Sequence, residues 1–331
     1  MNRFELTRAG SVADALAKIA GNEHARFIAG GTNLLDLMKE DVSRPQLLID
    51  ITRLPLSNIE ASDGGGLRIG AMVSNADLAY DDSVAQGYPL LSTAILAGAS
   101  PQLRNMASTG GNLLQRTRCY YFYDTGTACN KREPGTGCPA RTGLNRIHAI
   151  LGASESCVAV HPSDMCVALA ALDAVVHVSG PAGERRIPFD KFHQLPGDTP
   201  DIDTSLAPDE IIVAVELPVQ GYAQHHSYIK VRDRKSYAFA LVSVAAGLEM
   251  DGDTVRAASV ALGGVAHKPW RDREAEALLV GKPASEEQFQ AFADAVLRDA
   301  QPLEHNAFKI NLARRAIVRA LQRALAMEAA E

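Results

Sequence analysis

The stretch "ARFIAGGTNLLDLMK", residues 25–39, contains the pattern that decides the fold. A short apolar strand leads into two glycines and then into a segment with helical spacing. Such a turn leaves backbone N–H groups free at the start of the helix, where an anion can bind, and Thr32 and Asn33 add side-chain donors. The stretch lacks the G-x-G-x-x-G fingerprint and the P-loop lysine, so alone it indicates either an anion site or a tight turn.

A second stretch, "STGGNLL" at residues 108–114, repeats the same chemistry. It again places small hydroxyls, two glycines and an asparagine before an apolar pair. Two such loops can hold a diphosphate from opposite sides, because glycine lets a bulky anion approach the main chain. The pair of loops therefore favours an anionic cofactor over a simple turn.

The 331-residue chain is long enough for two or three domains. Helical and strand patterns alternate up to about residue 220, with helices capped by Ser11, Ser74 and Ser163. Beyond residue 220 the pattern changes to antiparallel strands with a hairpin turn at Asp251–Gly252, and two helices follow over residues 285–300 and 306–327. We predict an α+β chain with a domain boundary near residue 220.

Composition and charge exclude several classes of partner. The net charge of -6 and the absence of clustered Lys and Arg argue against nucleic acid and against a polybasic membrane contact. No apolar run reaches the ~18 residues of a membrane span, and the N-terminus lacks the apolar stretch of a secretion signal. Five cysteines at irregular spacing are a poor match to a disulfide framework. We expect small-molecule or protein partners.

Four motifs in order carry a resemblance to a known family: "FIAGGTNLLDLMK" (27–39), "LRIGAMVSNADL" (67–78), "SPQLRNMASTGGNL" (100–113) and "HPSDMCVALAALDA" (161–174). The chain resembles the FAD-binding subunits of the xanthine dehydrogenase and molybdenum hydroxylase family. The resemblance implies a two-lobed FAD-binding domain of the PCMH, vanillyl-alcohol-oxidase-like type over residues 1–220, with lobes at about 1–55 and 56–220. It also implies a smaller CO-dehydrogenase-flavoprotein-like domain over residues 221–331, with an antiparallel sheet and helices.

The resemblance also implies which residues hold the cofactor. The FAD contacts would be Ala29, Gly30, Gly31, Thr32, Asn33, Leu34, Ser108, Thr109, Gly110, Gly111, Asn112, Asp164 and Lys230. Asp164 would accept hydrogen bonds from flavin-chain hydroxyls, or it is simply an acid favoured at a helix N-terminus. Lys230 would offset negative charge on reduced flavin, or it is an exposed strand lysine. No catalytic side chain is predicted.

Residues 115–157 lack regular periodicity and contain Cys119, Cys129, Cys138 and Cys157. This spacing is similar to that of periplasmic-type aldehyde oxidoreductases whose flavin subunit carries an extra 4Fe-4S cluster, so the resemblance implies that these cysteines are cluster ligands. Their polar neighbours favour metal ligands over buried thiols, and the absence of closely paired cysteines argues against zinc. Cys166 is the alternative fourth ligand, although its place on an apolar helix favours a buried thiol.

The function implied is an electron-transfer FAD subunit of a molybdenum-containing aldehyde oxidoreductase. It would pass electrons from the molybdenum-cofactor and 2Fe-2S subunits of a hetero-oligomer to a small-molecule or protein acceptor. The alternatives are a flavin subunit of the 4-hydroxybenzoyl-CoA reductase type, a stand-alone NAD(P)H-dependent flavin oxidoreductase and a zinc-ordered module without flavin. We expect the complex in the periplasm, exported by a partner's signal, with the cytoplasm as the alternative. His161, His193 and the pair His225–His226 are interpreted as structural, because no cysteine or carboxylate partner is apparent.

Overall fold

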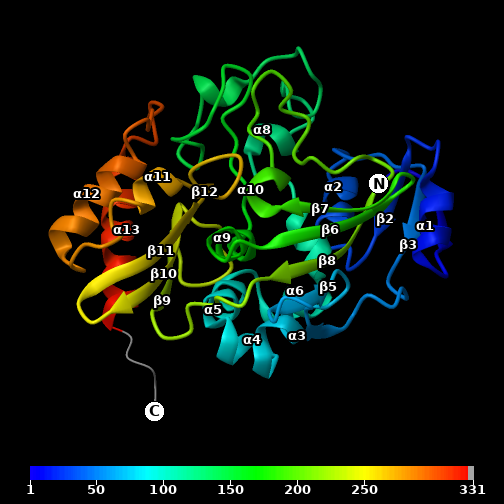
Figure 1. Ribbon diagram of the computed structural model, residues 1–331. Coiled ribbons are helices and arrows are strands. Elements are labelled where there is room, and N and C mark those ends of the chain that lie inside the picture. The colour runs from blue at the N-terminus through cyan, green and yellow to red at the C-terminus, as the bar shows by residue number, and fades with distance from the viewer. Residues whose placement is uncertain (327–331) are drawn as a thin grey trace.

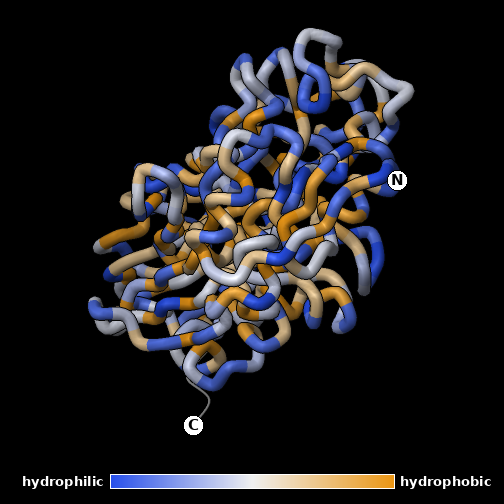
Figure 2. Tube along the Cα trace, turned by 90° about the vertical axis from the view of Figure 1, so that its right-hand side faces the viewer, coloured by the Kyte–Doolittle hydropathy of each residue, from blue (hydrophilic) through white to orange (hydrophobic). Residues whose placement is uncertain are grey.

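The computed structural model describes residues 1–326, which form three β-sheets arranged in sequence order along the molecule (Figure 1). The N-terminal and C-terminal sheets lie at opposite ends, and the middle sheet lies between them. Hydrophobic segments concentrate in the interior of the trace, with hydrophilic turns at its margin (Figure 2). The mixed arrangement confirms the predicted α+β class.

The N-terminal lobe is a small parallel sheet with strand order β1-β3-β2. Leu47 lies opposite both Glu5 and Ala25, so the central strand is paired on both sides. The first helix begins as predicted, because the Ser11 side chain accepts a hydrogen bond from the Asp14 N–H. The elements are β1 (Glu5–Arg8), α1 (Val12–Ile19), β2 (Ala25–Ile28), α2 (Leu34–Lys39) and β3 (Leu47–Asp50).

The second lobe is an antiparallel sheet with strand order β4-β5-β8-β6-β7. Helices pack beside it, and two of them begin at Ser74 and Ser163, whose side chains accept backbone N–H groups as predicted. The strands are β4 (Ile59–Ala61), β5 (Leu67–Gly70), β6 (Val175–Gly180), β7 (Gly183–Pro188) and β8 (Ile211–Leu217). The helices are α3 (Asn75–Tyr80), α4 (Asp82–Gly87), α5 (Pro89–Ala97), α6 (Pro101–Met106), α7 (Thr109–Leu113), α9 (Asp164–Ala171) and α10 (Phe189–Phe192).

The C-terminal part is an antiparallel sheet with strand order β12-β11-β10-β9. The predicted hairpin joins its two long strands, since Asp251 pairs with Thr254 and Gly252 has a φ of 56°. Helices α5 and α9 of the second lobe pack against one face of this sheet, and α12 and α13 belong to the apolar cluster on its other face. The predicted last residue of the final helix, Met327, lies outside the described residues. The elements are β9 (His226–Val231), β10 (Val242–Asp251), β11 (Thr254–Gly263), β12 (Trp270–Arg271), α11 (Arg273–Glu276), α12 (Glu286–Val296) and α13 (Phe308–Ala326).

Residues 115–157 form an irregular insertion at the top of Figure 1, with only the short helix α8 (Tyr120–Tyr123) and the 3-10 turn η1 (Pro139–Arg141). The expectation that polar neighbours leave Cys119, Cys129 and Cys138 unburied was wrong for the first two, which are buried; Cys138 is half-buried. Apolar side chains from the loop, such as Phe122, and from outside it, such as Leu37, cover them. The thiols and these apolar side chains therefore form a small core that is separate from the other apolar clusters.

Candidate functional site

A cavity of about 770 Å³ lies between the two glycine loops, the start of α9 and the segment that follows β9. Its volume falls within the range of roughly 300–1,000 Å³ that is typical of ligand and cofactor sites. The segments that meet around it are far apart in sequence, so the cavity is a product of the fold.

Glycine brings the two predicted loops together. A Cβ atom added at Gly30 would lie 1.6 Å from the carbonyl oxygen of Met106, two residues before the second loop. Only a residue without a side chain permits this approach, and Gly31 has a φ of 72°. Gly30 is thus needed for contact between the loops, a role distinct from the predicted approach of a diphosphate.

The structure divides the predicted FAD contacts into two groups. Thr32, Asn33, Gly111, Asn112, Asp164 and Lys230 line the cavity. The remaining predicted residues do not line it: Ala29, Gly30, Gly31, Leu34, Ser108, Thr109 and Gly110. Thr109, for example, is buried and donates its hydroxyl to the Val73 carbonyl at 3.0 Å. The loops therefore present few side chains directly to a ligand.

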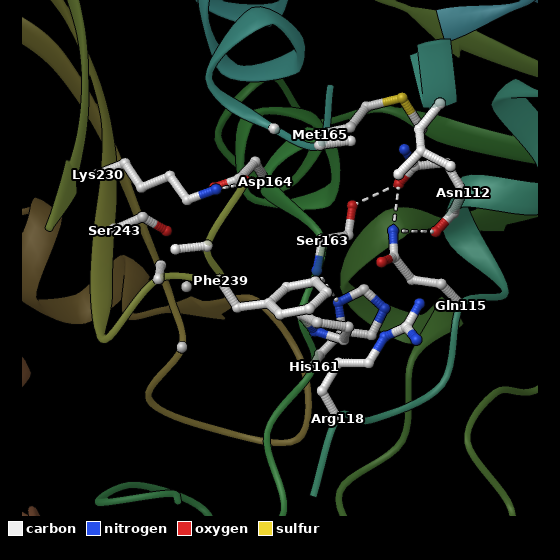
Figure 3. Close-up of a pocket in the computed structure, with 18 of the residues that line it drawn as sticks. Asn112, Gln115, Arg118, His161, Ser163, Asp164, Met165, Lys230, Phe239 and Ser243 are labelled. Carbon is white, nitrogen blue, oxygen red and sulfur yellow. Dashed lines mark hydrogen bonds and ion pairs between the residues drawn. The ribbon is translucent and has the colours of Figure 1, made fainter. Parts of the chain in front are cut away.

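Asp164 and Lys230 form a buried ion pair on one side of the cavity (Figure 3). Their Oδ2 and Nζ atoms lie 2.7 Å apart, and their side chains are 8% and 4% exposed. Tyr228 donates its hydroxyl to the other Asp164 oxygen at 2.6 Å, and Lys230 also donates to the Ala97 carbonyl. The alternative of an exposed strand lysine was therefore wrong. Both oxygens of Asp164 already have protein donors.

Asn112 organises the opposite side of the cavity (Figure 3). Its side-chain oxygen accepts hydrogen bonds from Ser163 at 2.6 Å and from Gln115 at 2.8 Å, and its amide donates to Asn75 at 2.6 Å. These contacts join the second glycine loop to α3 and to the start of α9. A network of this kind fixes side-chain positions before a ligand binds.

Four buried nitrogen atoms that border the cavity have no hydrogen-bond partner within residues 1–326: Asn33 Nδ2, Arg104 Nε, Arg118 Nε and His161 Nε2. The first three are N–H donors. His161 Nε2 is a fourth, because Nδ1 accepts the Ser163 N–H at 3.4 Å and the ring hydrogen then lies on Nε2. Unpartnered buried donors are costly, so the cavity fits a ligand rich in acceptor oxygens, such as the diphosphate and ring carbonyls of FAD.

Sequence reasoning missed several of these cavity residues. Arg104, Arg118 and His161 come from three separate segments, and Phe239 lies opposite Arg118, whose guanidinium carbon is 5.2 Å from the ring centroid. None belongs to a glycine loop. Arg104 and His161 lie within two of the four sequence motifs but were given no cofactor role, whereas Arg118 and Phe239 are related to the site only by the fold.

The four predicted cysteines of the insertion surround a second, much smaller cavity of about 10 Å³. Cys119, Cys129, Cys138 and Cys157 all line it, whereas Cys166 does not. No three of their sulfur atoms lie within 4.8 Å of one another. A tetrahedral zinc site, with bonds of about 2.3 Å, would bring its sulfur atoms to about 3.8 Å from one another. The donor set is thus more widely spaced than a single zinc ion requires.

The thiols differ in acidity. Burial raises the pKa of Cys119 to about 11. A hydrogen bond from Cys157 instead lowers the pKa of Cys138 below its usual value. Cys119 itself lies 3.1 Å from Nε2 of His148. The insertion therefore brings thiols and one imidazole into direct contact.

Ion pairs to Asp203 attach the insertion to the second lobe. Arg116 donates to Asp203 at 2.6 Å, and Lys131, which is 2% exposed, pairs with the other oxygen. Burial opposes ionisation of Asp203, but the charges of Arg116 and Lys131 lower its pKa to about 2. The carboxylate is therefore ionised at neutral pH and holds the insertion at two points, Arg116 and Lys131.

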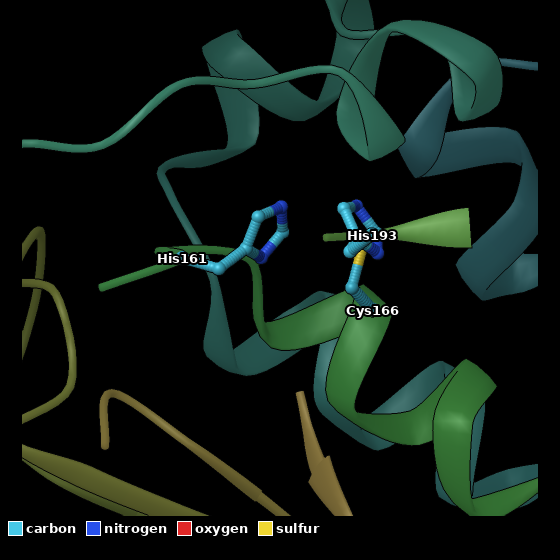
Figure 4. Close-up of side chains that lie close together, drawn as sticks. All are labelled: His161, Cys166 and His193. Carbon is cyan, nitrogen blue, oxygen red and sulfur yellow. The ribbon is translucent and has the colours of Figure 1, made fainter. Parts of the chain in front are cut away.

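His161, Cys166 and His193 lie together beside α9, with potential ligand atoms within 4.8 Å of one another (Figure 4). The prediction that these histidines have no cysteine nearby was therefore wrong, because folding brings α9 against the segment after α10. His193 Nε2 donates to the Leu113 carbonyl at 2.9 Å. His161 Nδ1 accepts the Ser163 N–H, so its remaining nitrogen is a donor and not a free ligand. We interpret the group as buried packing beside the cavity.

The family descriptions match nearly the whole chain. "FAD binding domain in molybdopterin dehydrogenase" matches residues 2–220, and "CO dehydrogenase flavoprotein C-terminal domain" matches residues 227–324. The chain belongs to the FAD-binding subunits of the molybdenum hydroxylase family. The resemblance drawn from the four sequence motifs and the fold class are both confirmed.

Similar proteins share this subunit organisation. The chain is 52% identical over 327 residues to the aldehyde oxidoreductase FAD-binding subunit PaoB of Escherichia coli, covering 98% of this chain and 99% of that protein. It is 27% identical to the glyceraldehyde dehydrogenase medium chain of Sulfolobus acidocaldarius, covering 90% and 89%. Carbon monoxide dehydrogenase from Hydrogenophaga pseudoflava gives a TM-score of 0.78 at 28% identity, covering 99% of each chain.

These relatives confirm that the chain is an oxidoreductase subunit with an FAD electron-transfer role. They favour this role over a stand-alone NAD(P)H-dependent flavin oxidoreductase or a 4-hydroxybenzoyl-CoA reductase-type subunit. Within residues 1–326, no helix combines the length and apolarity needed to cross a membrane.

Proposed function

We propose that this FAD-binding subunit serves a molybdenum-containing aldehyde oxidoreductase and carries a 4Fe-4S cluster in its insertion. The observation that carries the proposal is the position of Cys119. Its chain neighbours, Arg118 and Tyr120, both line the large cavity, while Cys119 lines the small one. One residue spans at most about 3.8 Å, so the two sites are nearly in contact. Two redox centres this close suit electron transfer.

In the large cavity, we propose that residues of this chain hold FAD by donating hydrogen bonds to it. Thr32, Asn33, Gly111 and Asn112 would face the diphosphate side, and the Asp164–Lys230 pair would face the opposite side. The remaining predicted contacts would shape the two loops behind the cofactor. Bound FAD supplies the hydride and single-electron chemistry, while the protein sets its position, potential and solvent access.

In the small cavity, Cys119, Cys129, Cys138 and Cys157 are the proposed cluster ligands. Four cysteine thiolates are the usual ligand set for a 4Fe-4S cluster. The absence of cysteines two to four residues apart in the sequence favours a cluster over zinc. The cavity has room for only about one water, so the four thiols would move apart to take in the eight atoms of the cluster.

We propose that the subunit works in a hetero-oligomer with a 2Fe-2S subunit and a molybdenum-cofactor subunit. The family membership and the similarity to PaoB support this assembly and an aldehyde substrate. We further propose that the folded complex is exported to the periplasm by a partner's signal; the cytoplasm is the alternative.

The test is reduction of the flavin in the purified complex under anaerobic conditions. An aldehyde should bleach the flavin absorbance when the partner subunits are present and should leave the isolated subunit unchanged. NADH should bleach neither sample. Rapid bleaching of the isolated subunit by NADH would overturn the proposed function in favour of a stand-alone reductase.

A further inference from the structure

His148 is a buried histidine within the insertion and lies directly against one of the proposed ligands. Its Nε2 atom is 3.1 Å from Cys119 Sγ, and the residue is 1% exposed. The rings of Tyr120 and Tyr121 pack around it at centroid distances of 6.4 and 6.3 Å. Its other nitrogen, Nδ1, has no partner within residues 1–326. The only polar side-chain contact of this imidazole is therefore a cysteine sulfur.

We propose that the His148 Nε2–H donates a hydrogen bond to the Cys119 thiolate and raises the reduction potential of the cluster. The inference rests on the proposed 4Fe-4S site. A ligating thiolate carries no hydrogen, so the hydrogen between the two atoms has to come from the imidazole. Reduction adds negative charge to the cluster and its ligands, which strengthens the hydrogen bond in the reduced state. Hydrogen bonds to the sulfurs are an established determinant of cluster potential.

The C-terminal domain holds this donor in place through the backbone of His148. The His148 carbonyl accepts hydrogen bonds from Lys309 Nζ at 2.7 Å and from Asn306 Nδ2 at 3.2 Å. Both donors are completely buried, and Lys309 also donates to the Gly264 carbonyl at 2.6 Å. Within the insertion, the His148 N–H donates to the Asn145 carbonyl at 3.1 Å. The imidazole is therefore attached to two parts of the chain and has little freedom to leave the sulfur.

The geometry distinguishes a tuning role from simple packing. A histidine used only to fill space can be replaced by phenylalanine without electronic consequence, and it needs no polar partner. Here a buried imidazole nitrogen lies 3.1 Å from sulfur, and a hydrogen bond to a charged acceptor is stronger than one between neutral groups. The reduction potential depends only on the difference in the strength of this hydrogen bond between the oxidised and the reduced cluster. We therefore expect removal of the donor to change the ratio of reduced to oxidised cluster by about threefold to tenfold at fixed ambient potential; tenfold corresponds to 59 mV for a one-electron couple.

The experiment compares four variants of the full chain in its complex. His148→Phe removes the donor, His148→Gln keeps an N–H at a similar reach, and His148→Asn keeps an amide that is too short. His225→Gln is the control, since this partly buried histidine bonds to the Ala324 carbonyl in the C-terminal domain. Iron and sulfide contents are measured first, and the midpoint potential is then determined by an EPR-monitored redox titration.

We expect full iron content throughout, a lower potential for His148→Phe and His148→Asn, and wild-type potentials for His148→Gln and the control. If the phenylalanine variant fails to assemble, the glutamine and asparagine variants decide the outcome. Unchanged potentials in iron-replete His148→Asn and His148→Phe would overturn the inference about His148 without contradicting the proposed cluster. Wild-type protein without iron would instead overturn the proposed cluster itself, so the two failures are distinguishable.

Discussion

Removing either charge of the Asp164–Lys230 pair should destabilise the chain strongly, and removing both should cost less than the sum of the two single changes. In Asp164→Asn, the buried Lys230 loses its counter-charge and keeps only neutral acceptors such as the Ala97 carbonyl. In Lys230→Met, the buried Asp164 carboxylate keeps only the Tyr228 hydroxyl. Breaking a buried pair in this way costs about 3–5 kcal/mol, because an uncompensated charge is left in a poorly solvated site.

The double variant Asp164→Asn/Lys230→Met leaves no buried charge. Its cost should fall short of the sum of the single costs by about 2–3 kcal/mol, the upper range for directly contacting residues. Urea unfolding of the flavin-free chain, followed by far-UV circular dichroism, measures all three values. The partly exposed pair Asp14–Lys18, whose side chains are 38% and 30% exposed, provides a control for which the coupling between the single changes should be small. Additive costs at Asp164 and Lys230 would refute the assignment of a coupled buried pair.

Two further predictions concern packing and pH. Gly30→Ala should destabilise the chain by about 3 kcal/mol and lower its flavin content, because the new Cβ collides with the Met106 backbone. Gly87→Ala, which has open space around it, should have neither effect. Equal urea unfolding midpoints for the two variants would contradict this prediction. Burial lowers the pKa of His193 to about 4 and that of His267 to about 3. Below pH 6.5 the unfolded chain therefore binds more protons than the folded chain, and stability is lost as the pH falls from 6.5 toward 4. Between pH 7 and 5.5 each histidine should cost about 1 kcal/mol in urea unfolding, and His267→Leu should flatten that slope; an unchanged slope would show that His267 is not the group responsible.

Local signals in the sequence were sufficient for much of the fold. Ser11, Ser74 and Ser163 begin helices because a hydroxyl before an apolar repeat caps free N–H groups, and that chemistry is local. The Asp251–Gly252 turn was equally readable, because glycine provides the positive φ that the hairpin needs. The paired glycine loops indicated the cofactor cavity because their pattern is repeated.

Non-local features were beyond the sequence. Burial of the insertion's thiols depends in part on Leu37, which lies on α2, far from the segment 115–157 in sequence. Tyr228 reaches Asp164 across 64 positions of the chain, and its role depends on how β9 packs beside α9. Composition around the cysteines therefore indicated an exposed loop, because it carries no information about which distant side chains cover it.

The anaerobically purified wild-type subunit should contain flavin and about four irons and four sulfides per chain, with the absorbance of an iron–sulfur protein. Serine replacements at Cys119, Cys129 or Cys138 should abolish the iron and keep the flavin, while Cys166→Ser should keep both. Flavin-replete wild-type protein without iron, or cysteine variants with undiminished iron, would contradict a cluster held by the insertion beside the FAD cavity.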